Sequence, residues 1–154
     1  TWRFYSPRLT SADLAAYAQS KGYQLLTSIA PREGFWVNAA KSFALPARSA
    51  LAVSVGAADL VAGWNLVSTG SVITPPDFNR SLVDTPPAAG TVAKNFTTLW
   101  AWDNAQSNWY FYAPSLEALG PTKVKEYTDL KGYLDFATEN KKLGLGVGFW
   151  VNKQ

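Results

Sequence analysis

The stretch GFWVN occurs twice in this chain, at Gly34 to Asn38 and again at Gly148 to Asn152. In each copy a tryptophan, Trp36 or Trp150, alternates with a flanking Phe and Val, and alternation with a period of two is typical of a strand. The glycine in front permits a tight turn or a bulge at the strand entry. The motif therefore predicts two short strands with one exposed face in both copies, and it indicates an internal repeat.

Two further blocks repeat in the same order as GFWVN. WRFYSPRL (Trp2 to Leu9) matches WYFYAPSL (Trp109 to Leu116) without a gap, and AYAQSKGY (Ala16 to Tyr23) matches EYTDLKGY (Glu126 to Tyr133). The insertions fall between the blocks, as expected when blocks are structural elements and gaps are loops.

The second copy has a front half, with GWNLV and LWAWD, that the first copy lacks. We therefore divide the chain into the C-terminal half of a first module (1–45), a connector (46–57) and a complete second module (58–154). The chain contains no Met, even at position 1, which we take to indicate a piece of a longer protein.

The expected fold class is mainly β (α+β), with short antiparallel strands and one short helix per module, repeated one and a half times. LWAWD and WYFYA flank the turn-forming residues DNAQSN, which predicts a hairpin. GWNLVS predicts a further strand. Ser11 and Thr122 are the expected helix N-caps, and Gly22 and Gly132 the expected helix ends.

Side chains two apart share a strand face, so Trp109 and Phe111 point one way and Tyr110 and Tyr112 the other. Arg3 stands where the second copy has Tyr110. We therefore predict that Trp109 and Phe111 face the core, and that the two tyrosines face outward.

Composition and chemistry limit the possible functions. The chain is 47% hydrophobic and 16% charged, with a net charge of +3 and scattered basic residues, which favours a folded protein and disfavours nucleic-acid binding. It has no Cys and no His, so thiolate and imidazole chemistry are absent. The acidic residues most open to a catalytic reading are instead expected to serve turns and caps: Asp59, Asp77, Asp84, Asp103 and Asp135. We expect no enzyme activity, cofactor or metal.

The 22 aromatic residues are the remaining signal. Large rings can simply fill the core of a small module. Alternatively, Trp100 or Trp102 forms a platform with Tyr110 and Tyr112 that stacks on sugar rings or contacts a partner.

The ordered blocks GWNLV, LWAWD, WxFYxP, KGY and GFWVN resemble the tryptophan-rich modules repeated in tandem near the C-terminal ends of large secreted or cell-surface proteins of Gram-negative bacteria. The resemblance covers nearly the whole chain apart from about residues 42–57. It implies an extracellular or cell-surface, non-enzymatic part of a larger protein, with a structural, adhesive or assembly role. Carbohydrate binding by exposed aromatic side chains is the alternative.

The first module lacks its front half, which should leave strand edges and an apolar face uncovered. The residues expected at that interface are Trp2, Phe4 and Trp36. We expect residues 1–41 to pair with the second module, with another copy or with a separate chain. The expected partners are other copies of the module or the rest of the parent protein, with glycans as a further option. We expect neither nucleic-acid binding nor membrane insertion.

Overall fold

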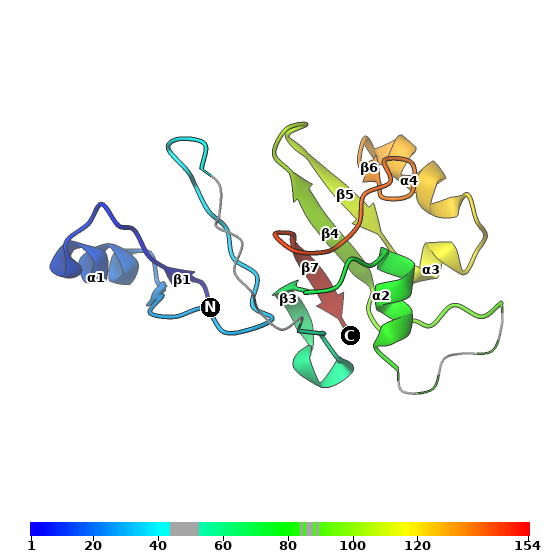
Figure 1. Cartoon of the computed structure of the whole chain (residues 1–154), viewed down its shortest axis with the longest axis horizontal. Coiled ribbons are helices and arrows are strands. Elements are labelled where there is room, and N and C mark those ends of the chain that lie inside the picture. Colours follow the sequence, from blue (N-terminus) through cyan, green and yellow to red (C-terminus); the bar gives the residue numbers. More distant parts are fainter. Residues whose placement is uncertain (44–52, 84, 86–87, 89) are drawn as a thin grey trace. The chain divides into compact units, whose positions relative to one another are not determined.

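The chain forms two compact units, Thr1–Pro31 and Arg32–Gln154 (Figure 1). The computed structural model describes residues 1–43, 53–83, 85, 88 and 90–154. Most of the predicted connector, 46–57, lies outside the described residues. Residues 32–43, which the sequence assigned to the first module, belong to the second unit.

A five-stranded sheet organises the second unit. Its strand order is β3-β7-β4-β5-β6, and the strands are β3 (Gly63–Ser68), β4 (Thr98–Asp103), β5 (Asn108–Tyr112), β6 (Leu134–Asp135) and β7 (Gly148–Lys153). The predicted hairpin is confirmed as β4 and β5, and GWNLVS and the second GFWVN are confirmed as β3 and β7. The sheet is mixed and not wholly antiparallel, because β6 pairs in parallel with β5.

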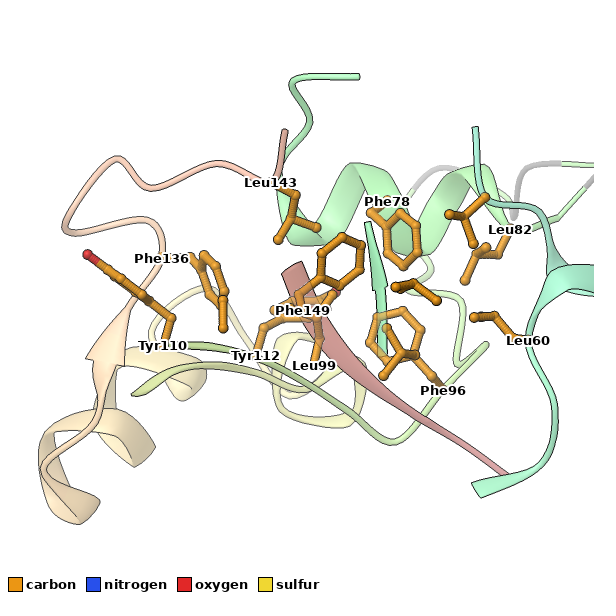
Figure 2. Packing of buried hydrophobic residues seen from close by; sticks show 14 residues of the cluster. Leu60, Phe78, Leu82, Phe96, Leu99, Tyr110, Tyr112, Phe136, Leu143 and Phe149 are labelled. Atoms are coloured by element: carbon orange, nitrogen blue, oxygen red, sulfur yellow. The ribbon is translucent and has the colours of Figure 1, made fainter. Parts of the chain in front are cut away.

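One face of the sheet carries the hydrophobic core, and we call it the core face. The buried hydrophobic strand residues of this face are Val67, Leu99, Ala101, Tyr110, Tyr112, Phe149 and Val151. Helix α2 (Pro75–Ser81) packs on this face, where its Phe78 ring stands edge-on to Phe149 with 5.1 Å between ring centres (Figure 2). The protein is thus α+β, with its core between a helix and one sheet face.

Helix α2 was not predicted from the sequence, and it begins with two prolines, Pro75 and Pro76. Proline is favourable in the first helical turn, where its missing N–H would have no partner. Thr74 caps this helix, since its hydroxyl accepts a hydrogen bond from the Asp77 N–H at 3.2 Å. With α3 (Pro114–Glu117) and α4 (Lys123–Lys131) also present, the prediction of one helix per module is wrong.

The helix ends expected at glycine are confirmed in both units. Helix α1 (Ser11–Ser20) is followed by Gly22 at φ +68°, and α4 ends at Gly132 at φ +73°. Both glycines occupy the left-handed region that terminates helices at low cost. At the start of α1 the cap is Thr10 and not Ser11.

The first unit packs around the Phe4 ring. Strand β1 (Arg3–Phe4) pairs in parallel with β2 (Gln24–Leu25). The centre of the Phe4 ring lies 4.9 Å from that of Tyr17 on α1 and 6.3 Å from that of Tyr23. The Tyr23 N–H donates to the Ala18 carbonyl at 2.9 Å, which folds the chain back after the helix.

The aligned residues of the second unit have the same local geometry. The Phe111 ring centre lies 4.8 Å from that of Tyr127 and 6.1 Å from that of Tyr133. The Tyr133 N–H donates to the Thr128 carbonyl at 2.9 Å. Strands β5 and β6 pair in parallel in the register that β1 and β2 use, so the aligned blocks form equivalent structures.

The first GFWVN copy, 34–38, is not a strand, and its prediction as one is wrong. The second copy, β7, pairs with both β3 and β4. The backbone at the start of the first copy is bonded to the outer edge of β3, through the bridge between the preceding Glu33 and Val67 and through the hydrogen bond of 3.0 Å from the Gly34 N–H to the Leu66 carbonyl. The motif GFWVN therefore forms a strand at β7, which has a strand on each side. At 34–38, where β3 is the one adjacent strand, it makes a short edge contact.

Candidate functional site

Tryptophans gather on the sheet face opposite the core, which we call the tryptophan face. Trp36, Trp100, Trp102 and Trp109 form one ring cluster there, and Trp150 and Trp64 stand edge-on to each other on the same face. Trp100 and Trp102 share this face because they are two apart on β4. Trp109 on β5 pairs directly with Trp102, with 5.1 Å between ring centres. The cluster therefore contains Trp100 and Trp102 from the predicted platform, together with two tryptophans that the platform did not include.

Trp36 reaches this face from outside the sheet. The segment 32–34 is held on the edge of β3, because the Ser68 N–H donates to the Arg32 carbonyl at 3.0 Å and the Gly34 N–H donates to Leu66. Two residues after Gly34, the Trp36 ring stands nearly edge-on to the Trp109 ring of β5, with 5.8 Å between ring centres. Trp36, one of the residues predicted at an interface, thus contacts Trp109 within the second unit.

A shallow pocket of about 140 Å³ opens beside these rings. Its lining residues are Phe35, Trp36, Val37, Leu66, Trp102 and Gly148. None of the lining side chains is charged, so the pocket offers mainly ring faces and aliphatic surface to a ligand.

Replacing Gly34 by alanine should release this segment from β3. An added Cβ at Gly34 would lie 2.9 Å from both the Leu66 Cγ and the Val67 carbonyl oxygen, closer than carbon atoms can approach without movement. We expect faster amide hydrogen exchange at Ser68 and around Trp36. Gly148→Ala, in the same motif, is the control, because its nearest new contact is an ordinary 3.8 Å. Equal effects of the two substitutions would contradict the prediction.

Tyr110 and Tyr112 do not lie on the tryptophan face, and their predicted outward orientation is wrong. Both are buried on the core face, and the Tyr110 ring centre lies 5.0 Å from that of Phe136 (Figure 2). The small Ala101 is paired with both Tyr110 and Phe149, which leaves room for these rings. The prediction was wrong because it relied on the alignment of Tyr110 with Arg3. Arg3 is exposed in the first unit, whereas Tyr110 is buried in the core of the second unit.

Both tyrosines interact with carboxylates, Tyr112 with Glu117 and Tyr110 with Asp103. Tyr112 donates to Glu117, and burial, followed by the hydrogen bond and the charge of Glu117, raises the pKa of Tyr112. Burial also raises the pKa of Tyr110, with further contributions from Asp103 and Glu139. Both phenols therefore stay protonated in the physiological range, as structural groups.

Asp103 shapes the β4–β5 turn. Its Oδ1 accepts hydrogen bonds from the backbone N–H groups of Gln106 at 3.1 Å and Ala105 at 2.9 Å, and these bonds lower the pKa of Asp103. The predicted role in a turn is confirmed. The ionised carboxylate consequently stabilises the hairpin.

The hairpin should lose stability in acid. Because the folded pKa of Asp103 is depressed, its contribution is present above the unfolded pKa of about 3.9 and is lost as the pH falls through the folded pKa. We expect Asp103→Asn, which keeps an oxygen acceptor but cannot titrate, to show a smaller fall in melting temperature between about pH 5 and pH 2. An identical fall in both proteins would contradict this role.

Other acidic side chains also have structural partners. Asp59 accepts from the Gly56 N–H at 2.8 Å, and Asp135 accepts from the Thr138 N–H at 2.7 Å. Asp77 takes part in the cap of α2, whereas Asp84 lies outside the described residues. The described part of the chain contains no group of three or more acidic, His or Cys residues arranged to hold a metal ion.

No family model matches the chain, and comparisons with curated proteins and with solved structures found no match. Among the described residues, no helix has the length and apolar character needed to cross a membrane.

Proposed function

We propose that this protein is a non-enzymatic structural, adhesive or assembly module of a larger secreted or surface-exposed bacterial protein. In this proposal it consists of the second half of one repeat (1–45), a connector (46–57) and one complete repeat (58–154). Its partners are other copies of the module or the rest of the parent protein.

The observation that carries the proposal is the shared geometry of the aligned blocks. A phenylalanine contacts two tyrosines in each unit, at 4.9 and 6.3 Å in the first and at 4.8 and 6.1 Å in the second. Tandem copies of one small unit are typical of arrays, in which each copy contacts its neighbours.

Differences in exposure between the units support an assembly role. Tyr5 is 58% exposed, whereas the aligned Tyr112 is 3% exposed. Trp2 and Tyr17 are also exposed, while the aligned Trp109 and Tyr127 are half-buried. Aromatic side chains that are exposed in one unit and covered in its counterpart are the ones we expect a partner to cover.

Self-association tests this role. We expect sedimentation velocity to show reversible association that strengthens with protein concentration, and Tyr5→Ser to weaken it. Leu119→Ser is the control, because Leu119 is an exposed apolar residue of the second unit. A monomer at every concentration, or equal weakening by the control, would count against an assembly role for the first unit.

Carbohydrate binding is the second candidate, and the pocket beside Trp36 and Trp102 favours it. Sugar rings stack on exposed aromatic faces of this kind. Affinity electrophoresis on a broad panel of glycans should then show retardation that Trp102→Ala abolishes. Trp64→Ala is the control, because Trp64 is exposed but does not line the pocket. Unretarded migration on every glycan would exclude the candidate.

A further inference from the structure

Both copies of the GFWVN motif line the pocket beside Trp36 and Trp102. Phe35, Trp36 and Val37 come from the first copy and Gly148 from the second. A Cβ added at Gly148 would lie 3.8 Å from the Phe35 carbonyl oxygen and 4.0 Å from the Phe35 backbone nitrogen, so the backbone of the first copy passes beside this glycine. The pocket therefore forms where the first copy of the motif meets the sheet that contains the second copy.

Gly148 keeps the pocket open. Side chains alternate along β7, so a side chain at position 148 would point to the tryptophan face, as that of Trp150 does. Gly148 is exposed, and the lining residues Leu66 and Trp102 belong to β3 and β4, the two strands that flank β7. Any residue with a side chain would therefore place it in the space between these neighbours.

The size of the pocket suits a single six-membered ring. Its volume is about 140 Å³, and an apolar cavity of about 150 Å³ in a protein takes up one benzene molecule. The pocket is shallow, so a ring bound in it keeps its rim in water. This arrangement fits a ring with one apolar face and a polar rim, which is the chemistry of a pyranose sugar.

The lining also favours an uncharged ligand. The side chains that line the pocket carry no charge, and a carboxylate or ammonium group that loses water without gaining a partner binds at a high cost. A neutral sugar can leave most of its hydroxyls in water while its C–H face covers an indole ring. Among the lining side chains, the indole N–H groups of Trp36 and Trp102 can donate a hydrogen bond to the remaining hydroxyls.

We propose that this pocket is the binding site for one uncharged pyranose ring, and that Gly148 is the residue that admits the ring. The inference rests on the candidate function of carbohydrate binding and names its substrate class and its site. A ligand this small binds with a dissociation constant of about 1 mM. In an array, each junction between repeats that carry GFWVN holds one such pocket, and several weak sites together bind a repetitive glycan tightly.

Nuclear magnetic resonance titration of the whole chain tests the proposal. The probes are a panel of neutral methyl glycosides and short neutral oligosaccharides. At least one should shift the indole N–H signals of Trp36 and Trp102 in a saturable way and leave that of Trp64, which does not line the pocket, unchanged. Glucuronate and galacturonate, the charged counterparts of two of these sugars, should bind at least about tenfold more weakly.

A glycine pair tests the role of Gly148. Gly148→Ala should weaken binding of the same glycoside by about tenfold or more, because its methyl group occupies space that the ring needs. Gly56→Ala is the control, since its new Cβ also makes only an ordinary contact, at 3.7 Å, and lies outside the pocket lining. Hydrogen exchange of β3 and β7 checks that Gly148→Ala keeps the sheet intact. The titration of the unaltered chain decides the question even if it does not.

Three results would overturn the proposal: no shift of an indole signal by any neutral glycoside, shifts confined to tryptophans outside the pocket, or equal binding by Gly148→Ala and the unaltered chain. Saturable shifts with benzyl alcohol but with no glycoside would make the pocket a site for aromatic rings, and the sugar assignment would be wrong. If a glycan retards the chain in electrophoresis without changing the pocket signals, carbohydrate binding stands and its site lies elsewhere. If no glycan acts in either experiment, carbohydrate binding fails together with this inference.

Discussion

Replacement of Phe149 by alanine is expected to destabilise the second unit by about 3–5 kcal/mol, the usual cost of removing a fully buried phenylalanine ring. Phe149 is 0% exposed on β7, an interior strand of the sheet. Its ring contacts Phe78 of α2, and its backbone is paired with both β3 and β4. The cavity would therefore open between the helix and the middle of the sheet, where the surrounding side chains cannot close it.

The first copy of the motif supplies a matched control within the same protein. Phe35 occupies the same position in GFWVN but is 47% exposed, so Phe35→Ala should cost about 1 kcal/mol or less. Urea unfolding followed by far-ultraviolet circular dichroism measures both free energies of unfolding. Similar losses in the two variants would mean that Phe149 does not occupy the core as described.

Trp100→Ala should be the second large effect, with a loss of about 2–4 kcal/mol in the free energy of unfolding of the second unit. Trp100 contacts Phe111, Tyr133 and Trp109, all nearly edge-on. Without its indole, the tryptophan face would lose its central ring. We also expect α4 to become less stable. Tyr127, within this helix, and Tyr133, just after it, both pack on the Phe111 ring that Trp100 contacts.

Trp64→Ala is the control that tests whether the loss of any tryptophan of the sheet would lower the free energy of unfolding as Trp100→Ala does. Trp64 lies on β3 with its ring edge-on to Trp150, and it is exposed. We expect a loss of less than about 1 kcal/mol. Hydrogen exchange of the α4 amides separates the two variants, since only Trp100→Ala should accelerate it. Unchanged exchange in Trp100→Ala would contradict the proposed support of α4.

Local signals in the sequence predicted several elements well. The turn residues between LWAWD and WYFYA predicted the β4–β5 hairpin, and Gly22 and Gly132 marked the helix ends. Each signal depends on residues close together in the chain. Turn and cap preferences arise from local backbone conformations and hydrogen bonds, so they do not need the tertiary structure.

The side of the sheet that forms the core could not be predicted in this way. Strand β5 carries large rings on both faces, so alternation alone does not distinguish them. The decision comes from neighbours distant in sequence: Ala101 makes room for Tyr110 on one face, while Trp100 covers Phe111 on the other. The parallel strand β6 was missed for a similar reason, because its two residues gain their conformation from β5.

The candidate site was predicted only in part. Trp100 and Trp102 of β4 were predicted as site residues, and being two residues apart they share a strand face. The presence of Trp36 beside Trp109 could not be deduced, because it depends on 32–34 pairing with β3, 30 residues or more away in sequence. The glycine of the first GFWVN was the available signal, since the close approach of Leu66 and Val67 requires it.

The pairing of 32–34 with β3 also bears on solubility. β3 is the last strand on its side of the sheet, and an open strand rich in apolar side chains is a template for amyloid-like stacking. Because the Arg32 carbonyl and the Gly34 N–H occupy hydrogen-bonding groups of this edge, we expect segment 32–34 to hinder the pairing of β3 with another chain. We expect proteolytic cleavage near Gly34 to expose this edge and to make the second unit more prone to aggregation.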